Sequence, residues 1–127
     1  MLTAVEPPVR IRVNSCARGS TNACWRVGWR LTNLLREPLL LQDAWVPHGR
    51  FRGEGHIALH TSLAAGADHD LALNVLADEA PGTVVENAFL IVQMRSATQG
   101  WRVFARMKVV FGDVPTPTIE AVTAQPL

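Results

Sequence analysis

The chain has 127 residues, of which 48% are hydrophobic and 18% are charged, and its formal net charge is +1. This length suits one domain with a core of ordinary size, and the apolar content excludes a chain that is disordered throughout. The longest apolar run, 88–92, is far shorter than the ~18 residues of a membrane-spanning helix, so no span is expected.

The first predicted strands are marked by regular alternation. Segments 9–14 and 25–32 alternate apolar side chains with polar ones, most of them arginine. Because successive side chains of a strand point to opposite faces, each segment is predicted to be a half-buried strand with its arginines outside. A third strand is predicted over 39–46, between two prolines.

Four further strands complete the expected set. They are a short one over 56–60, one that starts at Leu71, and a long pair over 84–95 and 101–111. Residues 71–80 are also rich enough in leucine and alanine to form a short helix instead. Seven strands without a long helix predict an all-β fold, a two-sheet antiparallel β-sandwich over 1–114, with a closed barrel as the rival. Residues 115–127 are expected to form an extended, proline-rich C-terminal arm.

One pattern resembles a known class of domain. The stretch 25–33, followed by Glu37-Pro38-Leu39 and later by the turn sequence 63–66, resembles bacterial immunoglobulin-like and fibronectin-type-III-like sandwiches. This resemblance implies an immunoglobulin-like strand order, in a fold that hosts adhesion, carbohydrate binding, chaperoning and subunit docking. The chain has no tyrosine and no cysteine pair spaced to join two sheets, which argues against the antibody-type branch.

The two cysteines border the first predicted hairpin. Cys16 and Cys24 are separated by seven residues, a poor spacing for zinc, but a hairpin could place them opposite each other as a redox pair. Residues 1–8 lack the features of a secretory leader, so we expect a cytoplasmic protein in which free thiols are favoured over a disulfide.

Neither a metal site nor a catalytic site is expected. The four histidines fall in the segment 48–69, where the turn sequence Asp68-His69-Asp70 needs no metal to explain it. His56 and His60 would lie ~13 Å apart along a strand, too far to chelate one ion. The motifs of hydrolases, phosphate-binding loops and zinc proteases are absent, so the sequence predicts no enzyme and no cofactor.

The four tryptophans fit two interpretations, core residues or a sugar-stacking platform. Trp25, Trp29 and Trp101 share their strand faces with valine, leucine and methionine, which predicts core positions rather than a sugar-stacking platform. Trp45 ends its strand, and its position stays open between the two readings.

The loop 47–55 is the first candidate interaction site. It carries His48, Arg50, Phe51 and Arg52 among three glycines, and arginine with an aromatic residue is a composition enriched at interface hot spots. The alternative is an ordinary surface loop whose phenylalanine turns inward and closes the end of the sandwich.

Charge distribution gives the second candidate. Formal charge is +5 over residues 1–36, −6 over 37–86 and +2 over 87–127. If the first and last strands lie side by side, seven cations are expected to form a basic stripe, suited to a complementary partner or to head-to-tail self-association. Alternatively they only protect edge strands from aggregation. These cations are Arg10, Arg12, Arg26, Arg30, Arg102, Arg106 and Lys108.

The sequence as a whole predicts a non-catalytic protein–protein interaction module, an accessory or structural subunit of a larger assembly. The alternative is an anion or nucleic-acid binder that uses the arginine-rich face, which the near-neutral total charge disfavours. A carbohydrate-binding module is the third reading.

Overall fold

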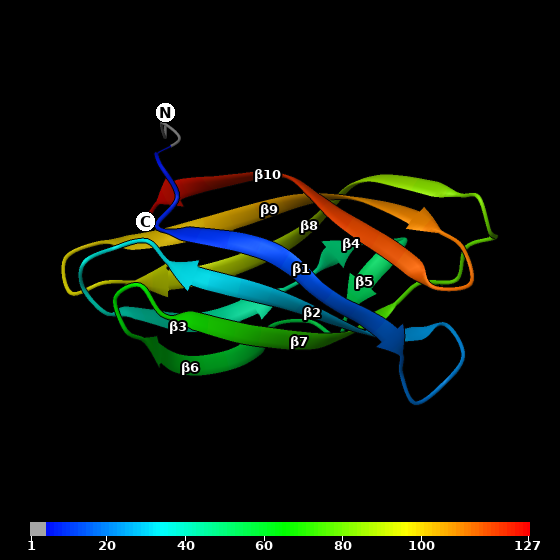
Figure 1. Cartoon of the computed structure of the whole chain (residues 1–127), viewed down its shortest axis with the longest axis horizontal. Coiled ribbons are helices and arrows are strands. Elements are labelled where there is room, and N and C mark those ends of the chain that lie inside the picture. The colour runs from blue at the N-terminus through cyan, green and yellow to red at the C-terminus, as the bar shows by residue number, and fades with distance from the viewer. Residues whose placement is uncertain (1–4) are drawn as a thin grey trace.

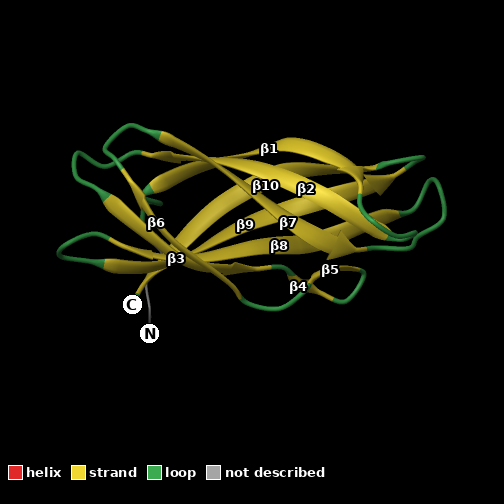
Figure 2. Ribbon diagram, turned by 90° about the horizontal axis from the view of Figure 1, so that it is seen from below, coloured by secondary structure: helices red, strands yellow, loops and turns green. Residues whose placement is uncertain are grey.

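The fold is a sandwich of two antiparallel five-stranded sheets (Figures 1 and 2). The structure is a computed structural model that describes residues 5–127. The first sheet has the order β1-β2-β7-β5-β4 and the second has the order β10-β9-β8-β3-β6. Their strands are β1 (Val9–Arg18), β2 (Cys24–Asn33), β3 (Leu39–Trp45), β4 (Pro47–His48), β5 (Phe51–Gly53), β6 (Ile57–Leu63), β7 (Asp68–Leu76), β8 (Val84–Arg95), β9 (Gly100–Phe111) and β10 (Pro115–Pro126).

The predicted all-β, two-sheet class is confirmed, with ten strands rather than about seven. Two of the additional strands, β4 and β5, come from the segment expected to be a loop, and a third, β10, comes from the segment expected to be an arm. Among the described residues no helix is long and apolar enough to cross a membrane.

The C-terminal segment is therefore an edge strand and not a free arm. β10 pairs with β9 from Pro115↔Phe111 to Pro126↔Trp101, with one bulge. Proline is tolerated there because its missing N–H falls on the open side of an edge strand. The proline-rich composition predicted an extended backbone correctly but gave no signal for pairing.

Residues 68–76 form strand β7, so the alternative helix over 71–80 is wrong. Leu71, Leu73 and Val75 are buried on one face and alternate with more exposed residues. Period-two burial against β2 outweighs the intrinsic helix preference of leucine and alanine.

The core reading of the tryptophans is confirmed. Trp29 is fully buried, and Trp25 and Trp101 are 7% and 9% exposed. The indole of Trp29 donates to the sulfur of Met107 across the two sheets, at 3.4 Å, and the indole of Trp25 donates to the carbonyl of Ala77, at 2.9 Å. Both indole donors are satisfied, so neither ring carries an unpaired polar group into the core.

Asn33 connects the three segments on which the immunoglobulin-like resemblance rests. It is 1% exposed, and its side-chain amide donates to the carbonyls of Glu37, Leu63 and Ala64 at 2.9, 3.0 and 3.2 Å. Its side-chain oxygen accepts from the backbone N–H of Leu35 at 2.9 Å. One buried side chain thus fixes the β2–β3 connection onto the β6–β7 turn.

Candidate functional site

The segment 47–55 forms the β4–β5 hairpin, and its predicted site residues separate. Phe51 is fully buried and packs in the core, so it closes this end of the sandwich and is not available on the surface. Arg50 forms an ion pair with Glu79, and its backbone N–H donates to Nδ1 of His48 at 3.0 Å. Arg52 is exposed and has no ion pair among the described residues.

The seven cations of the predicted basic stripe do not share one face. Arg10, Arg12, Arg26 and Arg30 lie on the outer face of the first sheet, on β1 and β2. Arg102, Arg106 and Lys108 lie on β9, on the outer face of the second sheet. The strand that lies beside β1 is β10 and not, as expected, β9, which carries the second group of cations (Figure 1), so the two groups lie on either side of the β1–β10 seam.

Within the first group, some cations have partners and others have none. Arg30 forms an ion pair with Asp70, with Nε and Oδ1 2.9 Å apart, and Arg26 donates to Asn74 at 3.1 Å. Arg12 stands directly opposite Arg30, so two like charges are neighbours across β1 and β2. In the part of the chain that the structure describes, neither Arg10 nor Arg12 has a carboxylate partner.

The Arg30–Asp70 pair predicts a pH dependence. The hydrogen bond from Arg30 lowers the pKa of the Asp70 carboxyl, and the same contact raises the pKa of Arg30. A carboxyl with a lowered folded-state pKa stabilises the fold above its unfolded value of about 3.9 and loses that contribution as pH falls through the folded value. When the pH is lowered from about 6 to about 2.5, the free energy of unfolding is therefore expected to fall less for Asp70→Asn than for wild type. Urea denaturation at each pH measures this difference.

An apolar patch on the outer face of the second sheet was not predicted as a site. Phe104, Ile91 and Trp45 stand opposite one another on the adjacent strands β9, β8 and β3. Phe89 meets Phe104 edge to face, with ring centroids 6.3 Å apart. Here the apolar patch means Trp45, Phe89, Ile91 and Phe104. No third layer covers it within residues 5–127 (Figure 2).

The signal for this patch was present in the sequence. In the strand 101–111, Phe104 falls on the face that otherwise carries Arg102, Arg106 and Lys108. Alternation placed it outside, but the significance of a large aromatic residue among outward cations appears only when β8 and β3 bring apolar neighbours to it. Sequence alone does not give the order of the strands in the sheet.

Trp45, whose position the sequence left open, lies at the margin of the patch. The ring of His56 stacks on it, with centroids 3.9 Å apart, and Nδ1 of His56 lies 3.0 Å from the carboxylate of Asp43. The guanidinium of Arg102 lies 5.9 Å from the centre of the Trp45 ring. His56 thus covers one face of this indole, and the other three tryptophans are buried. Within residues 5–127 there is therefore no row of open tryptophan rings for sugar stacking.

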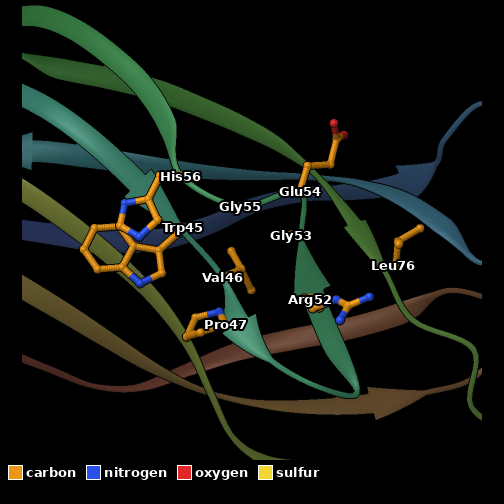
Figure 3. A pocket seen from close by; sticks show the side chains of 9 residues that line it. All are labelled: Trp45, Val46, Pro47, Arg52, Gly53, Glu54, Gly55, His56 and Leu76. Carbon is orange, nitrogen blue, oxygen red and sulfur yellow. The ribbon is translucent and has the colours of Figure 1, made fainter.

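A pocket of about 450 Å³ adjoins this margin, where the chain passes from β3 to the β4–β5 hairpin and back to β6. Figure 3 shows the Trp45–His56 stack on one side of the pocket and Arg52 and Leu76 on the other. Its lining is mainly apolar, with one cation and one carboxylate, Glu54. Such a pocket suits an apolar side chain of a partner at the end of the patch.

Arg102 and Arg106 form a polar rim beside the patch. Arg102 stands opposite Gln93, and Arg106 lies 3.5 Å from Glu120. The Nε of Arg102 and the Oε1 of Gln93 are buried without a hydrogen-bond partner in the structure. Buried polar atoms without a partner cost free energy, and these two lie on the strands that carry the partly exposed aromatic rings.

The structure does not bring the two cysteines together. Cys16 stands opposite Val27, three residues along β2 from Cys24, and an odd separation directs the two side chains to opposite faces. Both are free thiols. Burial raises the pKa of the Cys16 thiol, which lowers its thiolate fraction and its reactivity. The two cysteines lie on opposite faces because the bulge between Val13 and Ser15 adds one residue to β1 and so reverses the face that Cys16 occupies.

Within residues 5–127, no three or more histidine, cysteine or acidic side chains are grouped so that they could hold a metal ion. Comparison with known proteins finds no match to this chain among protein-family models, curated proteins or solved structures.

Proposed function

We propose that this domain is a non-catalytic protein-binding module that docks a partner protein on the apolar patch. The observation that carries the proposal is the combination of three partly exposed aromatic rings around Ile91 with arginines at the rim. Trp, Phe and Arg concentrate at the centres of protein interfaces, where they supply most of the binding energy. A docking role as an accessory or structural subunit follows from this surface.

The charges around the patch specify the chemistry of the partner. Arg95, Arg102 and Lys108 lie on the same outer face without an ion pair among the described residues, whereas two carboxylates of this sheet are engaged: Asp43 with His56, and Glu120 with Arg106. The partner surface is therefore an apolar centre bordered by aspartate or glutamate. Complementary charges of this kind increase the association rate and exclude wrong partners more than they add affinity.

The test begins with a photo-crosslinking amino acid at position 104, with a second at Leu34 as control, in cells of the source organism. Leu34 is 53% exposed and lies in the β2–β3 connection, away from the patch. We expect a discrete protein adduct from position 104 and none from position 34. Mass spectrometry then identifies the adduct, and the purified pair is titrated.

In that titration, Phe104→Glu is expected to weaken binding by about 100-fold, which corresponds to the roughly 2 kcal/mol or more of an interface hot spot. Leu34→Glu is expected to stay within about threefold of wild type. Equal affinities for wild type and Phe104→Glu would contradict the proposal. Binding of nucleic acid that is lost in Arg10→Ala/Arg12→Ala but retained in Phe104→Glu would favour the anion-binding alternative instead.

A further inference from the structure

β1 and β10, the edge strands of the two sheets, lie side by side (Figure 1). A groove runs along the seam between them. Two adjoining hollows of about 450 and about 280 Å³ form it, and both are lined by Val13 and Pro117. The first continues along Arg10–Val13, and the second along Val13–Cys16. The groove thus follows β1 for seven residues.

The open edge of β1 directs unpaired backbone groups toward this groove. The N–H of Leu34 donates to the carbonyl of Pro8 at 2.9 Å, and Val9 stands opposite Asn33 in the same register. Because the hydrogen-bonding direction alternates along an antiparallel strand, the backbone groups of Val9, Ile11 and Val13 point away from β2. No strand of the described chain pairs with that side of β1.

The β10 side of the groove offers few donors. Pro115 and Pro117 carry no N–H, so this part of the β10 edge can accept hydrogen bonds but cannot donate at those positions. Further along the same edge, the chain itself provides an example of an added extended segment. The N–H of Val5 donates to the carbonyl of Ala124 at 3.1 Å in an antiparallel bridge.

The side chains around the groove define the kind of segment that it would bind. Ile11 and Ile119 line it together with Val13 and Pro117, so its floor is apolar. Arg10 and Arg12 alternate with these residues on β1, are exposed, and have no carboxylate partner among the described residues. An edge with unpaired backbone groups, an apolar floor and a cationic border matches an extended acidic segment.

We propose that the β1–β10 seam is a strand-addition site for an extended segment of a partner protein that alternates apolar with acidic residues. Its backbone pairs with β1 at Ile11 and Val13, and its apolar side chains face the groove floor. Its carboxylates lie beside Arg10 and Arg12. The site is separate from the apolar patch, and its test uses no patch residue, so the two proposals stand or fall independently.

The test uses the full chain and three synthetic peptides, acetyl-Glu-Val-Glu-Val-Glu-amide, its lysine counterpart, and the acidic peptide with N-methyl groups on the backbone nitrogens that would pair with β1. Binding is followed by NMR titration, and protection by amide hydrogen exchange at Ile11 and Val13. We expect the acidic peptide to bind at least about tenfold more tightly than the lysine peptide and to protect both amides. N-methylation is expected to abolish binding.

Arg10→Glu/Arg12→Glu is the matched variant, and it is expected to reverse the preference between the acidic and the lysine peptide. Both positions are exposed, and unchanged spectra away from β1 would show that the variant is folded. Equal binding of the N-methylated and unmodified acidic peptides would overturn strand addition in favour of simple charge attraction. Absence of protection at Ile11 and Val13, or no preference between the peptides, would overturn the proposal outright.

Discussion

Replacing Asn33 with alanine is expected to lower the free energy of unfolding by about 3 kcal/mol. The substitution removes the amide that serves the carbonyls of Glu37, Leu63 and Ala64, and the oxygen that serves the N–H of Leu35. Each buried group left without a partner costs roughly 1–3 kcal/mol, and the costs are not additive where one side chain serves all of them. Urea denaturation followed by tryptophan fluorescence measures the change.

Asn74→Ala is the matched control for this prediction. Its side chain accepts one exposed hydrogen bond from Arg26, so the expected change is about 0.5 kcal/mol or less. A loss below about 1 kcal/mol in Asn33→Ala would show that the β2–β3 connection does not depend on this side chain.

The second large effect is expected at Phe51, whose replacement by alanine should cost about 3–5 kcal/mol. Phe51 is fully buried where the β4–β5 hairpin meets the core, so truncation leaves a cavity. Phe51→Leu retains most of the apolar volume and should cost distinctly less, and Arg52→Ala, beside it on the exposed side, should change stability by about 0.5 kcal/mol or less.

The Phe51→Ala variant also distinguishes the two interpretations of the 47–55 segment, an interaction loop or a hairpin that closes the core. If Phe51 closes the core, Phe51→Ala destabilises the domain and any loss of binding follows from unfolding. A stable Phe51→Ala variant that nevertheless loses a partner would restore the interface reading and would contradict the burial of this ring. The thermal midpoint, measured beside partner binding on the same sample, separates the two outcomes.

Much of the fold followed from alternation in the sequence. Segments 9–14, 25–32, 84–95 and 101–111 were predicted as strands, and β1, β2, β8 and β9 contain or match them. Period-two patterns are reliable where one face is buried and the other is polar. The additional strands β4 and β5 are too short to show this pattern. β10 does alternate over its first six residues, but its prolines are typical of an unpaired extended segment and hid the pairing with β9.

The candidate site was less predictable, since a surface patch depends on strand order. Phe104, Ile91 and Trp45 are distant in the sequence and become neighbours only because β9, β8 and β3 are adjacent. Similarly, the alternation that placed the first arginines outside was correct for each strand, but it could not show that β1 and β9 present theirs on different faces. Both the composition of the apolar patch and the separation of the cations depend on which strands are neighbours.

The bulge between Val13 and Ser15 shows the same limit on a smaller scale. Strict alternation from Val9 would place Cys16 on the face of the arginines, whereas the extra residue turns it toward the core and away from Cys24. One inserted residue reverses the face of every side chain that follows, and no residue type in this segment announces it.

Hydroxyl-radical footprinting of the domain, free and bound to its crosslinked partner, tests the central claim most directly. The account predicts that Trp45, Phe89 and Phe104 are oxidised in the free domain and become protected by at least about fivefold in the complex, as residues at the centre of an interface do. The exposed Leu34 should be oxidised equally in both. Unchanged oxidation of the three rings in a stoichiometric complex would contradict the assignment of the apolar patch as the docking surface.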